Sequence, residues 1–324
     1  MSLETEAVLD RRRLRRSMSF WRAGAVLAGV LALGIVSLFA AGGGSDGTLF
    51  ERRQIARVTL EGVITENRDQ LRLLEKLARN DSVAAVILYV NSPGGTTTGG
   101  EALYEAIRDV SSRKPIVAQF GTIATSAAYI AGLATDHIFA RGNTITGSVG
   151  VIFQWAEVSE LLGKIGVRMN EIKSGPLKAE PSPFHPLEPA GRETAERMVA
   201  ESMRWFRGLV ADRRKVDTAA IPGLEQGRIF SGREALEHKL IDAIGGETEV
   251  ASFLAEKKGV GRGLKIVDWK PKKEDSLGLF GMLGRALAGA LGIPGLGGSW
   301  LTDDPRIQAL QASGLVSVWQ PGEK

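Results

Sequence analysis

Apolar strand segments alternate with amphipathic helical segments through the middle of this chain. Residues 83–90 read VAAVILYV, a continuous apolar run that is typical of a strand covered on both faces. Apolar residues at helical spacing follow over 100–110, and further strands are expected over 115–120 and 137–140. This alternation predicts an α/β fold with a mostly parallel sheet. In such sheets, functional residues collect in the loops at the carboxyl ends of the strands.

The 324 residues divide into five segments by composition. We expect a basic N-terminus, a membrane anchor, a linker, one large α/β domain and a Gly/Leu/Ala-rich tail, over residues 1–22, 23–41, 42–55, 56–270 and 271–324. Within the α/β domain, further strands are expected over 57–64 and 167–172, and helices over 67–79, 126–133 and 189–214. In the tail, residues 276–296 are consistent with ordinary packing or oligomer contact and also with a lipid-touching surface.

The anchor prediction depends on the uncharged stretch 23–41. At about 1.5 Å per residue, this stretch nearly crosses a hydrocarbon core of about 30 Å. The arginines that precede it should stay in the cytoplasm, which sends the remaining chain outward. A cleaved signal peptide is the alternative, because residues 40–42 are small, but secretory apolar regions are usually only about 7 to 15 residues long. We therefore expect an uncleaved anchor.

Composition excludes several classes of function. The chain has no cysteine, so disulfides, thiolate metal sites and a cysteine nucleophile are excluded. Its three histidines are too scattered for an obvious metal cluster, and no metal or organic cofactor is expected. The net charge of +4 comes largely from arginines at 11–16 and 22, which leaves no electrostatic case for nucleic acid.

Four short segments hold the candidate chemistry: Asn-Ser-Pro-Gly-Gly at 91–95, Ala-Thr-Ser-Ala-Ala-Tyr at 124–129, Thr-Gly-Ser-Val-Gly at 146–150 and Ile-Lys-Ser-Gly at 172–175. Ser126 lies between a predicted strand and a predicted helix, where a serine is either an ordinary N-cap or an exposed nucleophile. Gly94 and Gly95 form a plain turn or provide amides that hold an oxyanion. Together the segments favour a serine nucleophile with a lysine base.

In order and wording, these segments resemble the signal peptide peptidase A family over residues 57–249. These are membrane-bound serine proteases with a Ser/Lys dyad, and they share an α/β superfold with Clp protease and crotonases. The resemblance implies a Clp/crotonase-like βαβ superhelical domain, with Ser126 as nucleophile and Lys173 as general base. It departs from the family at Ala127, where glycine is more frequent, and at 238–239, where a glycine is expected. The Ala127 amide would join Gly94 and Gly95 as an oxyanion donor.

A lysine base must be neutral to accept a proton. Lowering a pKa near 10.4 to about 7 requires roughly 4.6 kcal/mol of desolvation and neighbouring interactions. Burial provides this only if no carboxylate pairs with Lys173. Ser148 is expected to accept a hydrogen bond from the amine and orient its lone pair. Lys178 also fits the family stretch, but it lies in a proline-containing loop and is ranked second.

Three alternatives are weighed against this hypothesis. A Ser/His/Asp triad would use Asp136 and His137, but adjacent residues on one strand point to opposite faces. A crotonase-like enzyme would bind an acyl thioester and use Gly94 and Gly95 for an enolate. A non-catalytic membrane scaffold would retain only the fold.

The resemblance also implies partners and a location. The substrates would be peptides, either remnant signal peptides or other apolar segments. The enzyme would be a homo-oligomer, in which Ser126 and Lys173 meet within one chain or across a subunit boundary. It would lie in the bacterial cytoplasmic membrane as a single-pass protein, with its N-terminus in the cytoplasm and the peptidase domain outside it.

Overall fold

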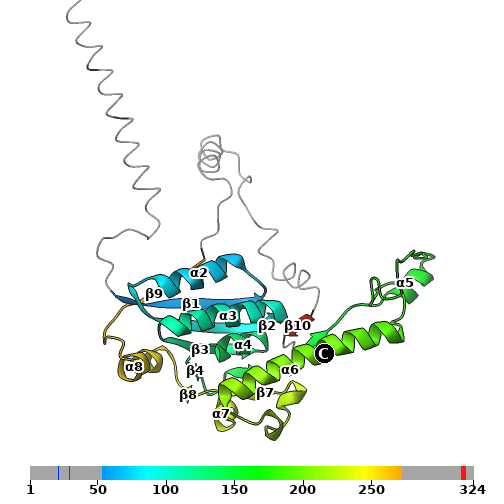
Figure 1. Cartoon of the computed structure of the whole chain (residues 1–324). Helices are drawn as coiled ribbons and strands as arrows, with labels where there is room; N and C mark the ends of the chain where they lie inside the picture. The colour runs from blue at the N-terminus through cyan, green and yellow to red at the C-terminus, as the bar shows by residue number, and fades with distance from the viewer. Residues whose placement is uncertain (1–20, 22–28, 30–52, 272–314, 319–324) are drawn as a thin grey trace, which may run out of the picture. The chain divides into compact units, whose positions relative to one another are not determined.

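A computed structural model describes residues 53–271 and 315–318, with Trp21 and Gly29 as isolated positions. One sheet organises this part of the chain (Figure 1). Its strands are β1 (Gln54–Ile64), β2 (Val83–Thr96), β3 (Ile116–Thr125), β4 (His137–Ala140), β5 (Ile145–Gly147), β6 (Ile152–Phe153), β7 (Ile229–Ser231), β8 (Ala243–Ile244), β9 (Ile266–Trp269) and β10 (Leu315–Val318). The helices are α2 (Arg68–Arg79), α3 (Thr97–Arg113), α4 (Ala127–Leu133), α5 (Ser159–Lys164), α6 (Pro189–Arg214), α7 (Gly232–Glu237) and α8 (Glu247–Lys257), with short 3₁₀ turns at Thr218–Ala220 and Leu224–Gln226.

The sheet is mostly parallel, as the alternation of elements predicts. β1, β2, β3, β4 and β8 pair in parallel, and β9 and β5 add in parallel to β1 and β3. Among the described strands, the antiparallel pairs are those of β10 with β2 and β6 and that of β7 with β5. The element order β-α-β-α-β therefore builds one continuous α/β layer structure.

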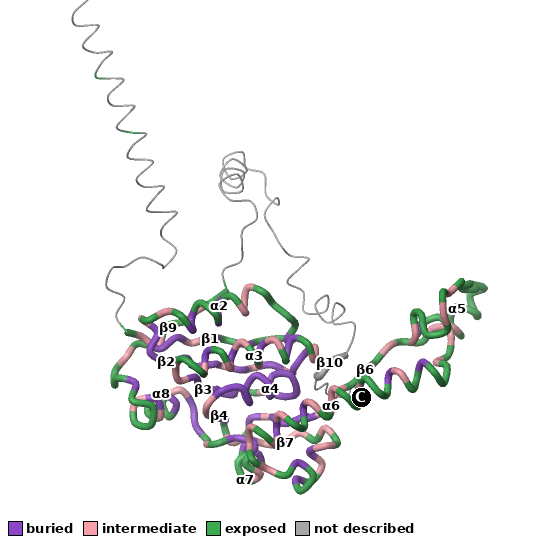
Figure 2. Tube along the Cα trace, in the orientation of Figure 1, coloured by how far each residue is buried: buried purple, intermediate pink, exposed green. Residues whose placement is uncertain are grey.

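Both faces of the central strands are covered (Figure 2). Along β2, Val86, Leu88 and Val90 belong to the core beneath α2, α3 and α4. The alternate residues Ala85 and Ile87 belong to a second core beneath α8. The period-2 geometry of a strand thus explains why the whole run is apolar.

β2 is longer than expected. It continues as a strand to Thr96, through residues 91–95, where the sequence predicts a turn. β1 runs beside it to its end, where Ile64 pairs with Gly95. A Cβ at Gly95 would lie 1.7 Å from the Ile64 carbonyl oxygen. Glycine is needed there because of the close approach of β1.

Residues 154–188 form what we call the arm, which projects from the sheet together with the beginning of α6 (Figure 1). The later part of α6 joins the main core through Phe206 and Val210, and Arg213 Nε donates to the Leu133 carbonyl at 2.7 Å. None of the residues of α5 is buried. The arm is therefore held mainly through α6.

The strand expected over 167–172 is not formed. Val167, Met169 and Ile172 are exposed instead. A strand needs a partner for its backbone groups, and the arm projects away from the sheet that could pair with it. That expectation was wrong for the single protomer.

The departure from the family at 238–239 has a local explanation. Lys239 adopts a left-handed conformation, with φ 57°, between α7 and the segment that leads to β8. This is the conformation that glycine adopts without steric cost. Lys239 therefore adopts the left-handed conformation at the position where the resemblance leads us to expect a glycine.

In the part of the chain that the structure describes, no helix has the length and apolar character needed to cross a membrane. The expected anchor at 23–41 and the expected tail segment at 276–296 lie outside the described residues.

Candidate active site

Ser126 occupies a sharp turn between β3 and α4. Its side chain makes no capping hydrogen bond to α4, and its backbone has φ 58° and ψ −121°. A non-glycine residue held in such a region costs about 1 to 3 kcal/mol, and strain of this kind clusters at active sites. The serine of a nucleophile elbow occupies a similarly strained strand-to-helix turn. The local geometry therefore argues against the ordinary N-cap and for a functional serine.

Ser148 lies beside Ser126. β3 and β5 are parallel neighbours in which Thr125 pairs with Gly147, so each serine directly follows the end of its strand. The backbone N–H of Ser126 donates to the Gly147 carbonyl at 2.9 Å. Ser148 also has a positive φ of 53° and is largely buried. The fold thus brings together two of the residues that the sequence singled out.

The glycine segment of β2 is tied to the same place. Thr125 Oγ1 donates to the Pro93 carbonyl at 3.0 Å, which connects the residue before Ser126 to the residue before Gly94. The Gly94 N–H donates to Ser92 Oγ at 3.1 Å, so in this conformation it is engaged within its own strand. Ala127 is fully buried in the first turn of α4. The segments that carry the candidate oxyanion donors therefore meet beside the Ser126 turn, with the Gly94 N–H engaged by another acceptor.

A second segment of the chain lies against these glycines. Gly95 pairs with Ile64 of β1 on one edge of β2 and with Ser317 of β10 on the other. Along that other edge, β3 pairs with β2 only as far as Ala124, two residues before Ser126. Beyond this point β10 pairs with the same edge of β2, and the other edge of β10 pairs with β6. An extended peptide thus lies between β2 and β6 next to the Ser126 turn.

Lys173 lies on the arm, in a cluster of ionisable side chains. Its Nζ is 2.9 Å from Glu171 Oε2, 3.1 Å from Glu180 Oε1 and 3.0 Å from His185 Nε2. The hydrogen bonds to Glu171 and Glu180 raise the pKa of the Lys173 amine above its ordinary value. The expected neutral amine requires the absence of such carboxylates, so in this arrangement Lys173 is a cation. The single protomer does not bring it to Ser126.

Lys178 also lies on the arm and is exposed. Its backbone N–H closes a turn to the Gly175 carbonyl at 3.1 Å. Its amine makes no hydrogen bond or ion pair with any residue in the described ranges. Of the two candidate lysines, Lys178 is therefore the one whose amine has no hydrogen-bond or ion-pair partner among the described residues.

The residues Asp136 and His137 do not form a triad with Ser126. His137 pairs with Val117 near the start of β3, whereas Ser126 follows the end of that strand. Nine residues at about 3.3 Å each separate these positions by roughly 30 Å. His137 instead stacks on Phe253, with ring centroids 4.1 Å apart.

Sequence reasoning missed Glu171, Glu180, His185 and β10. Glu171 lies only two residues before Lys173, so the sequence alone could have indicated an ion pair between them. Glu180 and His185 are separated from Lys173 by a loop whose path the sequence does not reveal. Among the described residues, no group of His, Asp and Glu side chains is arranged to hold a metal ion.

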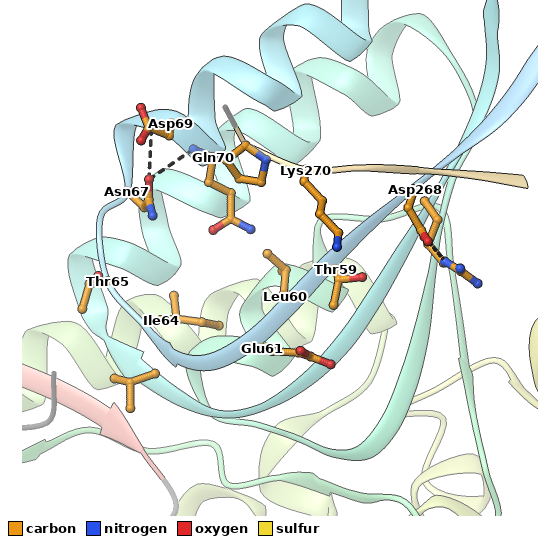
Figure 3. A pocket seen from close by; sticks show the side chains of 13 residues that line it. Thr59, Leu60, Glu61, Ile64, Thr65, Asn67, Asp69, Gln70, Asp268 and Lys270 are labelled. Atoms are coloured by element: carbon orange, nitrogen blue, oxygen red, sulfur yellow. Dashed lines mark hydrogen bonds and ion pairs between the residues drawn. The ribbon is translucent and has the colours of Figure 1, made fainter. Parts of the chain in front are cut away.

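Two cavities among the described residues lie away from these side chains. A cavity of about 860 Å³ lies between β1, the start of α2 and the end of β9, with Glu61, Asn67 and Lys270 among its lining residues (Figure 3). A smaller one of about 370 Å³ is lined by residues that include Tyr89, Gln119 and Arg141. Neither is lined by Ser126, Ser148 or the arm lysines.

The chain is similar in sequence to known peptidases. The model of Peptidase family S49 matches residues 108–261, and the Clp protease model matches residues 48–143. A provisionally named protease of Synechocystis sp. is 31% identical over 210 residues, which are 64% of this chain and 76% of the relative. A provisionally named signal peptide peptidase SppA of Enterococcus faecium is 33% identical over 221 residues, 64% of this chain and 64% of the relative. The solved structure of a ClpP1 mutant from Listeria monocytogenes aligns with TM-score 0.39 and 16% identity, covering 60% of this chain and 92% of that one.

The S49 match spans Ser126, Ser148 and both arm lysines, and the Clp match spans Gly94, Gly95 and Ser126. These matches decide against the acyl-thioester and scaffold alternatives. The chain belongs to peptidase family S49 and is a serine peptidase on a Clp-like, mixed α/β fold.

Proposed function

We propose that the protein is an endopeptidase that binds extended apolar peptides and cleaves them through an acyl-enzyme on Ser126. The observation that carries this proposal is the position of β10. Its backbone pairs with Gly95 on one side and with β6 on the other, beside the Ser126 turn. A substrate strand in the same position would gain backbone hydrogen bonds from both neighbours, which is how extended peptides add to sheets.

In the proposed reaction, Ser126 Oγ attacks the scissile carbonyl carbon while a neutral lysine amine takes the hydroxyl proton. Backbone N–H groups around the turn stabilise the negative oxygen of the tetrahedral intermediate, and those of Ala127 and Gly95 are the candidate donors. The C–N bond then breaks as the ammonium returns the proton to the leaving amine. Water, activated by the same amine, hydrolyses the ester.

Two lysines can provide this base. The sequence favours Lys173, and that assignment stays a prediction. Its contacts with Glu171 and Glu180 stabilise the charged amine, which opposes base catalysis. Lys178 has no such partner among the described residues, and it lies on the same arm. We therefore infer that Lys178 is the stronger candidate for the base.

The arm points to a site shared between subunits. Its large exposed apolar side chains would be buried by a second copy of the chain; they are Leu161, Ile165, Val167, Met169, Ile172, Leu177 and Phe184. A neighbouring sheet edge would also supply the partner that residues 167–172 lack. We propose a homo-oligomer in which the arm of one protomer brings the base to Ser126 of the next.

We further propose that residues 23–41 anchor the enzyme in the bacterial cytoplasmic membrane, with the peptidase domain outside the cytoplasm. The uncharged stretch and the arginines before it support this topology. Peptides released in or near the membrane, including remnant signal peptides, would then be the accessible substrates.

The decisive experiment is covalent labelling of the full-length chain with a serine-reactive fluorophosphonate, followed by mass spectrometry. We expect stoichiometric modification of Ser126 and none of Ser148. Cleavage of an apolar signal-sequence peptide should be lost in Ser126→Ala. Labelling at another residue, or cleavage by well-folded Ser126→Ala, would overturn the proposal.

A further inference from the structure

The ionisable cluster on the arm joins residues on both sides of one turn. Glu171 and Lys173 precede the turn at 174–179, and Glu180 and His185 follow it. Lys173 Nζ contacts both carboxylates and the His185 ring, and His185 Nε2 is 3.2 Å from Glu180 Oε1. The cluster therefore closes the base of a loop, and Lys178 lies within that loop.

Glu180 is the centre of this cluster. Its side chain is only 5% exposed, although the surrounding arm is mostly exposed. Its Oε1 faces Lys173 and His185, while its buried Oε2 has no hydrogen-bond partner among the described residues. A buried carboxylate that loses its cationic partner is left as an uncompensated charge, so Glu180 needs the Lys173 amine to stay in this position.

Gly191 makes room for Glu180 at the start of α6. A Cβ at this position would lie 3.1 Å from Glu180 Cβ and 3.2 Å from Glu180 Oε2. The positive end of a helix favours a nearby carboxylate. The start of α6 thus packs against the Glu180 side chain. The same helix joins the arm to the core.

Local backbone hydrogen bonds also hold the loop. The Lys178 N–H donates to Gly175 at 3.1 Å, and the Glu180 N–H donates to the Leu177 carbonyl at 3.4 Å. Ala179, between them, has a positive φ of 64°. An alanine in this region is strained and stays there only if the surroundings hold it. The cluster at the base of the loop provides that restraint.

On the basis of the proposed function, we propose that Glu180 is a positioning residue, which with Lys173 holds the loop in the shape that presents Lys178 to Ser126. Lys173 then serves the reaction as a permanent cation and does not act as the base. Glu171 and His185 complete the contacts of its amine. Proton transfer depends steeply on the placement of the base, because a shift near 1 Å can cost about a hundredfold in rate.

The test replaces Lys173 by arginine and by methionine, and Lys178 by arginine, in the full-length chain. Arginine can keep an ion pair but cannot give up its proton, so it separates a positioning cation from a base. We expect Lys173→Arg to keep at least about a third of wild-type kcat, and Lys173→Met and Glu180→Gln to lose about tenfold to a hundredfold, with KM within twofold. Lys178→Arg should have no measurable turnover. Glu196→Gln is the control, because it removes an exposed ion pair with Arg192 on α6.

Each outcome distinguishes this inference from the proposed function. Wild-type kcat in Lys173→Met and Glu180→Gln, with Lys178→Arg inactive, would overturn the positioning role and leave the base assignment intact. An inactive Lys173→Arg beside an active Lys178→Arg would make Lys173 the base and overturn both. A change confined to KM would assign the cluster to peptide binding. Circular dichroism and thermal melting of every variant confirm that the comparisons are made on folded protein.

Gly191→Ala provides a route that alters neither lysine. The added methyl group should displace Glu180 by a few tenths of an ångström and lower kcat several-fold. Gly208→Ala on the same helix is the matched control, because nothing lies within 4 Å of its added Cβ. Equal kcat in the two variants would count against Glu180 as a positioning residue.

Discussion

The backbone N–H of Ser126 donates to the carbonyl of Gly147 across 2.9 Å. This bond continues the β3–β5 ladder by one residue beyond Thr125 and locks the turn in which Ser126 adopts its positive φ. The same bond places Ser148, the next residue after Gly147, beside the candidate nucleophile. Two serines that are 22 positions apart in the sequence thereby become neighbours at the ends of parallel strands.

The strained backbone at Ser126 predicts that replacing this serine by glycine stabilises the protein, although it abolishes activity. Glycine adopts this backbone conformation without the cost that a Cβ imposes. Ser126→Gly should therefore unfold with a free energy about 1 kcal/mol or more above that of Ser126→Ala, and both should be inactive. Urea unfolding of the two variants measures the difference. Equal free energies would show that the turn stores no strain.

The position of β10 predicts that the tail competes with substrate. If the segment Leu315–Val318 occupies the groove for most of the time, the apparent affinity for peptide is lowered by the fraction of open groove. Deleting residues 315–324 should lower KM, by about tenfold for a groove that is open a tenth of the time, and leave kcat unchanged. Steady-state kinetics on a soluble peptide checks this. An unchanged KM would mean that β10 does not block the groove.

The shared site predicts complementation between inactive chains. A ring with heterologous interfaces places one chain's Ser126 beside its neighbour's arm. Mixing Ser126→Ala with Lys178→Ala chains, after dissociation and reassembly, should restore roughly a quarter of wild-type turnover if subunits mix at random. Native mass spectrometry confirms the mixing. No recovery in proven mixed oligomers would place each site within one chain, and recovery only with Lys173→Ala would favour Lys173 as the base.

His137 predicts a loss of stability in mild acid. Burial lowers its pKa below the ordinary value, and the Asp242 carboxylate opposes this only in part. The folded protein therefore binds a proton less readily than the unfolded chain. Stability should be complete above the unfolded pKa, near 6.5, and fall as the pH drops below it. Urea unfolding at several pH values should show a weaker pH dependence in His137→Phe, and identical profiles would remove His137 as the cause.

Gly95 predicts a severe structural defect on substitution. The Ile64 carbonyl occupies the space of a Cβ, so Gly95→Ala must separate β1 from β2 or displace the end of β2. We expect a loss of more than about 2 kcal/mol of unfolding free energy, as for other overpacked core positions. Gly208→Ala, in open space on α6, should be neutral or stabilising by up to about 1 kcal/mol. Similar melting temperatures for the two variants would contradict the close approach.

Local pattern was sufficient for the central strands β1 to β4 and for the helices α2, α3, α4 and α6. The helix at 189–214 and the strand at 137–140 were predicted with the bounds that the structure has. Hydrophobic periodicity reports burial directly, and burial on both faces is what a central parallel strand requires. The mostly parallel sheet and the Ser126 turn therefore followed from the sequence.

Contacts between distant segments decided the rest. The expected strand at 167–172 did not form, because no strand among residues 53–271 and 315–318 pairs with it. β2 is longer than expected, because β1 and β10 pair with its glycines. The anchor, the oligomer and the identity of the base stay predictions.

The sequence by itself determined the central strands β1 to β4 and the serine that follows β3, because these properties depend on neighbours along the chain. Only the tertiary structure decided that a second carboxylate joins Glu171 at the Lys173 amine, because Glu180 reaches it through the path of a loop. A pKa responds to atoms a few ångströms away in space, and sequence distance does not report that separation.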